Sequence, residues 1–118
     1  MQEGALAGKA AIVTGGARGV GKGIATAFAK AGAGVLIVDR NADLGSATEA
    51  ELRAGGLQVV FLPFDLTRHH DLHQVVDAAL DHFGRLDSLV NVAQAALVSS
   101  TPQVTLRYGD FVNVIDVY

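Results

Sequence analysis

The sequence predicts an α/β fold, a doubly wound parallel sheet with helices on both faces. Short apolar runs alternate four times with segments whose apolar residues keep helical spacing. The runs are almost wholly apolar, as in strands that are buried on both faces, and parallel strands need helical crossovers between them. A chain of 118 residues with 50% hydrophobic residues fills one core. We therefore predict a single partial domain over residues 1–118, truncated after about four βα units.

The first half of the chain contains two strand–helix pairs. The run Ala10 to Val13 predicts a strand that leads through a glycine turn into the helical pattern "GKGIATAFAKAG", where Gly32 offers a stop. The next run, "GVLIVD", ends at Asp39. Asn41 follows as a cap for a helix over "ADLGSATEAELRA", which two glycines close.

The second half repeats this order. The run "LQVVFLPFD" ends at Asp65, and Thr67 is positioned to cap a helix that Gly84 terminates. The apolar face of that helix is Leu72, Val75, Val76, Ala79, Leu80 and Phe83. The run "LDSLVNVA" predicts the fourth strand, and "VTLRYGDFVNVIDVY" predicts the opening of a fourth helix.

Composition excludes several classes of protein. The net charge of −3 comes from interspersed charges, so we expect neither a nucleic-acid partner nor a membrane partner. Without cysteine there is no disulfide framework, no cysteine-ligated zinc and no thiolate nucleophile. No leader pattern or membrane-spanning apolar run is present in the sequence, which makes a cytoplasmic protein our expectation.

The turn after the first strand is crowded with glycine, at Gly15, Gly16, Gly19 and Gly21. Missing side chains let an anion approach the backbone, and the helix start offers free N–H groups and a positive dipole end for a pyrophosphate. Asp39 stands 18 residues after the last of these glycines, close to the spacing of about 20 expected for a carboxylate that binds a ribose hydroxyl. This context favours a Rossmann-type dinucleotide site over a glycine turn that serves packing alone.

These residues also carry a family resemblance. The run "TGGARGVG", from Thr14 to Gly21, matches the TGxxxGxG pattern of the classical short-chain dehydrogenase/reductases. Asp39, the "DLT" at residues 65–67 and the segment "FGRLDSLVNVA" match further landmarks in order. The sequence resembles this family over essentially its whole length.

The resemblance implies an NAD(P)-dependent hydride transfer to or from a carbonyl or alcohol carbon. It also implies that Asp39 binds the adenosine ribose, that Asp65 and Leu66 lie beside the adenine, and that Asn91 lies near the ribose. The implied cofactor-binding residues are Thr14, Gly15, Gly16, Arg18, Gly19, Val20, Gly21, Asp39, Arg40, Asp65, Leu66, Asn91, Val92 and Ala93.

The charges around Asp39 bear on the choice of cofactor. A carboxylate there repels a 2′-phosphate, so we expect NAD rather than NADP. Arg18 and Arg40 flank the same position and favour a phosphate. NADP therefore stays open as the second candidate.

The chain departs from the family pattern after the fourth strand. The family reads Asn-Asn-Ala-Gly where this chain has Asn91, Val92, Ala93 and Gln94. Val92 removes an amide that, in the family, ties the central strands together. Gln94 either obstructs the nucleotide or points outward.

The family's catalytic Tyr and Lys, four residues apart, have no counterpart. The tyrosines are Tyr108 and Tyr118, and every lysine lies upstream of both. We therefore expect no catalytic residue, and interpret the chain as the cofactor-binding half of such an oxidoreductase. A silent NAD-binding module and an interaction protein that pairs through an open sheet edge remain as alternatives.

The mean hydropathy of +0.34 is high for a small domain. We expect the fourth strand to form an exposed sheet edge, and hence self-association or a partner chain covering it. His69 and His73 have the spacing of a metal pair, but no further ligand completes a set, so we expect a solvated helix face and no metal site.

Overall fold

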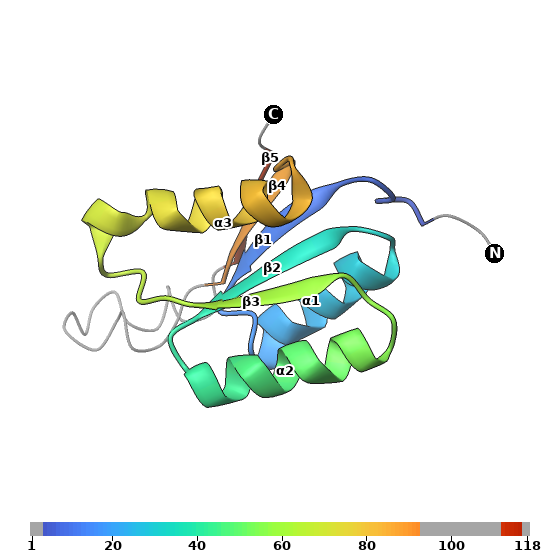
Figure 1. The fold of residues 1–118 in the computed structure, drawn as a ribbon, viewed down its shortest axis with the longest axis horizontal. Coiled ribbons are helices and arrows are strands. Elements are labelled where there is room, and N and C mark those ends of the chain that lie inside the picture. The colour runs from blue at the N-terminus through green and yellow to red at the C-terminus, as the bar shows by residue number, and fades with distance from the viewer. Residues whose placement is uncertain (1–3, 93–111, 117–118) are drawn as a thin grey trace.

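The computed structural model describes residues 4–92 and 112–116, and these form one sheet with helices on both faces (Figure 1). In chain order the elements are β1 (Ala10–Thr14), α1 (Gly19–Lys30), β2 (Gly34–Asp39), α2 (Ala42–Ala54), β3 (Val59–Pro63), the short 3₁₀ helix η1 (His69–Asp71), α3 (His73–Phe83), β4 (Ser88–Val92) and β5 (Val112–Asp116). The strand order is β3-β2-β1-β4-β5. The first four strands pair in parallel, which confirms the predicted doubly wound parallel sheet.

Two helices cover one face of this sheet and one covers the other. In Figure 1, α1 and α2 lie below the sheet and α3 lies above it. Successive strand residues point to opposite faces, so Ile12 packs under α3 whereas Val13 packs with α1 and α2. All residues of β1 are buried, which is why its first four residues are continuously apolar rather than alternating.

The predicted helix ends are largely confirmed. Asn41 caps α2, because its side-chain oxygen accepts a hydrogen bond from the Leu44 N–H at 3.0 Å. Gly84 ends α3 in the left-handed region, with φ of 76°, and its N–H donates to the Leu80 carbonyl at 2.8 Å. Both sequence signals therefore correspond to real backbone geometry.

The predicted start of the third helix was wrong. Thr67 does not cap it, because the Thr67 hydroxyl donates to the Asp65 carboxylate at 2.7 Å. The chain passes through η1 first, and α3 begins at His73. The Thr67 side chain is engaged in the turn after β3 and cannot serve a helix that begins later.

The predicted fourth helix was also wrong, because residues 112–116 form the antiparallel strand β5. The segment "VNVID" is rich in β-branched residues, and it pairs with the side of β4 that β1 leaves free. Asn113 lies opposite Asn91 in this ladder. The expectation that β4 forms an exposed edge is corrected accordingly, since β3 and β5 are the outer strands. Self-association stays a prediction, without the support of a free β4 edge.

Candidate functional site

The candidate site lies where the order of the strands reverses. From β1 the chain winds outward through β2 to β3, and it then returns to place β4 on the other side of β1. The winding direction of the chain therefore reverses between β1 and β4, which makes the carboxyl edge beside these two strands the switch point of the sheet. In open α/β sheets such a switch point is where ligands bind.

The glycine turn joins β1 to α1 at this point. Gly15 and Gly19 have φ values of 67° and 60°, a region that residues with a side chain rarely adopt. A Cβ atom on Gly21 would overlap the carbonyl group of Gly15, so the helix start lies directly against the turn. A Cβ on Gly19, by contrast, would meet no atom within 4 Å. The turn is therefore tightly packed on its inner side and open on the side of Gly19.

The first turn of α1 is free of negative charge. Arg18 occupies the N-cap position in extended conformation and makes no side-chain cap hydrogen bond, and no acidic residue lies in the first turn. Val20 is 63% exposed beside it. Helix N–H groups and the positive end of the helix dipole thus face outward without a side-chain partner, as an anion site requires.

The Asp39 carboxylate at the end of β2 reaches the glycine turn. One oxygen accepts a hydrogen bond from the Ala17 N–H at 3.3 Å, and the other accepts from the Asn41 N–H at 2.9 Å. The side chain is only partly buried, so its remaining lone pairs are accessible to a hydroxyl donor. Asp39 therefore supports the turn, a role that the sequence analysis did not predict, and it stays the candidate ribose ligand.

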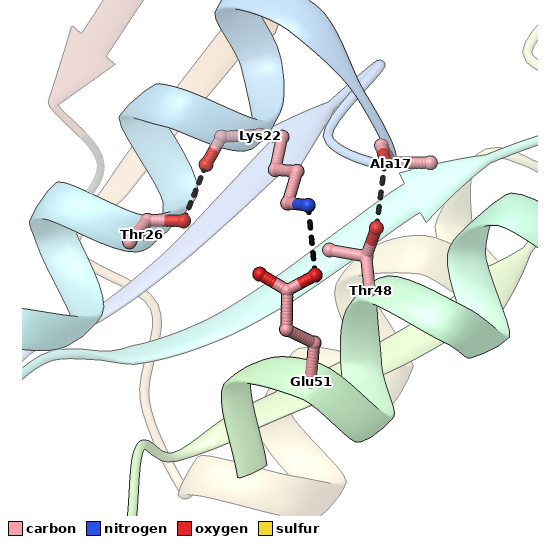
Figure 2. Close-up of polar contacts among 5 residues, drawn as sticks. All are labelled: Ala17, Lys22, Thr26, Thr48 and Glu51. Carbon is pink, nitrogen blue, oxygen red and sulfur yellow. Dashed lines mark hydrogen bonds and ion pairs between the residues drawn. The ribbon is translucent and has the colours of Figure 1, made fainter. Parts of the chain in front are cut away.

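Helix α2 supports the same turn from the side. The buried Thr48 hydroxyl donates to the Ala17 carbonyl at 2.6 Å, and the exposed pair Lys22 and Glu51 joins α1 to α2 at 3.0 Å (Figure 2). The sequence analysis missed Thr48. One signal was available, because Thr48 shares the buried helix stripe of Gly45 and Leu52, where a polar residue needs a partner.

A second polar group ties β1 to β4. The buried Thr14 hydroxyl lies 3.3 Å from both the Val90 carbonyl oxygen and the Asn91 side-chain oxygen, and it accepts from the Val92 N–H at 3.1 Å. Thr14 thus joins the two strands that flank the switch point. Its hydroxyl links the main chain of these strands although Val92 replaces the family's second asparagine.

Asp65 lies in the turn after β3. The Thr67 hydroxyl and N–H both donate to it, at 2.7 Å and 2.9 Å, and these hydrogen bonds hold the pKa of Asp65 below its ordinary value. The charges of Arg40 and Arg68 lower this pKa further. Asp65 is therefore ionised at neutral pH, while the adjacent Leu66 packs against the core under α3.

The structure brings most of the predicted residues to one edge of the sheet. Those that lie at or directly after the carboxyl ends of β1, β2, β3 and β4 are Thr14, Gly15, Gly16, Arg18, Gly19, Val20, Gly21, Asp39, Arg40, Asp65, Leu66, Asn91 and Val92. Ala93, Gln94 and the tyrosines Tyr108 and Tyr118 lie outside the described residues.

The described part of the chain holds neither a candidate metal cluster nor a helix that could span a membrane. No cluster of three or more His, Cys, Asp or Glu side chains able to hold a metal ion occurs within residues 4–92 and 112–116. His73 is exposed at the first position of α3. Within the same residues, no helix has the length and apolar character needed to cross a membrane.

The parallel sheet, its switch point and the glycine turn together define the Rossmann-type class of α/β domains. A family model described as short chain dehydrogenase matches residues 9–117. The chain therefore belongs to the short-chain dehydrogenase family.

Individual relatives are longer than this chain. L-fucose dehydrogenase of Bos taurus is 47% identical over 103 residues, which cover 87% of this chain and 37% of that enzyme. A hydroxysteroid dehydrogenase structure from Escherichia coli matches with a TM-score of 0.72 and 40% identity, over 75% of this chain and 38% of its own. A 7α-hydroxysteroid dehydrogenase, solved with NADH and 7-oxo glycochenodeoxycholic acid, matches with a TM-score of 0.67 and 39% identity, over 70% and 32% of the two chains.

Proposed function

We propose that this chain forms the cofactor-binding part of an NAD(P)-dependent oxidoreductase. The proposal rests on one observation above all: the glycine turn between β1 and α1, open at Gly19, lies in hydrogen-bond contact with the Asp39 carboxylate. The relative solved with NADH supports it, because this chain shares the fold and 39% of the aligned residues with that enzyme.

Three parts of a dinucleotide, namely the pyrophosphate, the adenosine ribose and the adenine, have a matching group at this edge of the sheet. The N–H groups at the start of α1 suit the pyrophosphate, because no acidic residue lies in that turn. The free lone pairs of Asp39 suit the hydroxyls of the adenosine ribose. The Asp65 carboxylate, oriented by its hydrogen bonds from Thr67, is an acceptor for the exocyclic amine of the adenine.

NAD is the preferred cofactor in this proposal. A 2′-phosphate would bring two negative charges next to the Asp39 carboxylate, and the same carboxylate would lose its ribose hydroxyl partner. Arg18 and Arg40 are both exposed at this edge and reduce the repulsion. We expect the repulsion of a 2′-phosphate by Asp39 to outweigh the attraction by the two arginines, because the carboxylate already lies in contact with the turn, through the Ala17 N–H.

The chemistry of the reaction belongs to the cofactor, which accepts or donates a hydride at its nicotinamide ring when bound. The residues described here bind and orient it. Thr14 joins β1 to β4 at the switch point, and thereby holds together the carboxyl ends of the two strands that flank it. The proposed substrate class is a compound with an alcohol or carbonyl group.

The test is a calorimetric titration of the purified chain with NADH, using a matched pair of glycine variants. Gly19 and Gly56 both have positive φ, 60° and 85°, and a Cβ on either meets no atom within 4 Å. Gly19→Ala and Gly56→Ala therefore carry a similar backbone strain of about 1 kcal/mol. Only a Cβ on Gly19 projects where the pyrophosphate is proposed to lie.

We expect saturable NADH binding by the unmodified chain and by Gly56→Ala, with a dissociation constant at least about tenfold weaker in Gly19→Ala. Absence of binding to the unmodified chain would refute the proposal. Equal weakening in the two variants would show that strain, and not the proposed anion site, sets the affinity.

A further inference from the structure

Both main-chain polar groups of Ala17 are held by side chains from other elements. Its N–H donates to the Asp39 carboxylate from the end of β2, at 3.3 Å. Its carbonyl accepts from the Thr48 hydroxyl of α2, at 2.6 Å (Figure 2). Ala17 is itself buried and directly precedes Arg18, the residue at which α1 is capped. The orientation of this residue therefore determines how the first N–H groups of α1 are presented.

Thr48 differs from Thr26, the other threonine of the described helices, because its hydrogen bond connects distant parts of the chain. It is 3% exposed, and its partner lies 31 residues earlier. Thr26 of α1, by comparison, donates at 2.7 Å to the Lys22 carbonyl one turn earlier in its own helix. Valine has nearly the same shape as threonine, so packing at position 48 does not by itself call for a hydroxyl.

We infer that Thr48 is a positioning residue for the cofactor turn, an inference that rests on the proposed function. Its hydroxyl fixes the Ala17 carbonyl, and through it the turn whose N–H groups are proposed to bind the pyrophosphate. The exposed pair of Lys22 and Glu51 reinforces the contact of α1 with α2 but does not touch the turn itself. A buried carbonyl without a partner is costly, so the turn rearranges when this hydroxyl is removed.

The pyrophosphate is common to both nicotinamide dinucleotides, and this yields a distinctive expectation. Loss of the Thr48 hydroxyl lowers the affinities for NADH and for NADPH by the same factor, about tenfold, which corresponds to about 1.4 kcal/mol of binding free energy. A change at Asp39, in contrast, alters the ratio of the two affinities. The ratio therefore distinguishes a residue that orients the turn from one that selects the cofactor.

The experiment compares Thr48→Val with Thr48→Ser and with the matched control Thr26→Val, by titration with NADH and NADPH and by thermal unfolding. We expect Thr48→Val to weaken both cofactors about tenfold, Thr48→Ser to restore most of the affinity, and Thr26→Val to leave it unchanged. If Thr48→Val does not fold, Thr48→Ala and Thr26→Ala replace the valine pair. A Thr48→Val chain that loses only thermal stability, with both affinities intact, overturns the inference.

Amide hydrogen exchange without cofactor separates this inference from the proposed function. The Ala17 and Lys22 amides donate to Asp39 and to the Arg18 carbonyl, respectively, so their exchange reports the order of the turn. We expect Thr48→Val to speed their exchange about tenfold, while the Val35 amide in β2 keeps its rate. If the unmodified chain binds no NADH, the proposed function fails, and the exchange rates still decide the role of Thr48. Unchanged exchange at Ala17 and Lys22 would contradict it.

Discussion

Asp39 provides the sharpest prediction, because the same carboxylate is expected to attract one cofactor and repel the other. Replacing it by alanine removes a charged acceptor for the ribose hydroxyls. A hydrogen bond to a charged group contributes about 1.5–3 kcal/mol, so NADH affinity should fall by about one to two orders of magnitude. The Ala17 N–H also loses its 3.3 Å partner, which adds to the loss.

The effect on NADPH has the opposite sign. Two unit charges about 4 Å apart interact by about 4 kcal/mol at an effective dielectric constant near 20. Asp39 is only partly buried, and Arg18 and Arg40 lie exposed at the same edge. Screening by solvent and by these cations therefore reduces the repulsion between the carboxylate and the 2′-phosphate to about 1–2 kcal/mol. NADPH affinity should therefore rise by about tenfold, and the ratio of the two affinities should change by at least about a hundredfold.

The assay is a pair of titrations with NADH and NADPH on Asp39→Ala, Asp39→Asn and the control Asp43→Asn. Asparagine removes the charge and keeps one of the two acceptor oxygens, so it preserves one of the hydrogen bonds from the Ala17 and Asn41 N–H groups where alanine loses both. Asp43 is an exposed acid in the first turn of α2, and its neutralisation should leave the ratio unchanged. An Asp39→Asn chain that binds NADPH no better than the unmodified chain would refute the reasoning from charge.

Two predictions concern stability. A methyl group on Gly45 would overlap the Phe61 ring, which outweighs the better helix propensity of alanine. The unfolding free energy of Gly45→Ala, measured by urea titration, should therefore fall by about 1–2 kcal/mol. A more stable variant would show that α2 is free to move away from β3. The Asp87 carboxylate accepts from Arg85 and from the Ala10 N–H, which hold its pKa below the ordinary 3.8. Because the folded pKa is depressed, the stabilisation is complete above about pH 4 and is lost as the pH falls through the folded value. Asp87→Asn should therefore flatten the acid limb of a stability profile measured between about pH 2 and pH 6, and an unchanged limb would contradict the assignment.

The order of the elements in the first 92 residues could be read from the sequence, because their signals are local. Continuous apolar runs mark strands buried on both faces, and Asn41 and Gly84 mark helix ends through their own side-chain and backbone geometry. Predictions from local sequence were wrong where a residue or segment bonds to another partner in the fold. Thr67 looked like a helix cap but is engaged by Asp65, and the segment 112–116 looked helical but pairs with β4.

The candidate site divides in the same way. The glycine turn and Asp39 were recognisable because their spacing follows from the geometry of a strand, a turn and a helix. The helix pattern could mark Thr48 as a buried hydroxyl that needs a partner, but nothing near it in sequence reveals that this partner is the Ala17 carbonyl 31 residues away. The sequence by itself determined which segments become strands and helices and where an anion can approach the backbone. Only the tertiary structure decided which hydroxyl supports the turn and which strand closes the open side of β4, because both depend on groups that meet only after the sheet has assembled.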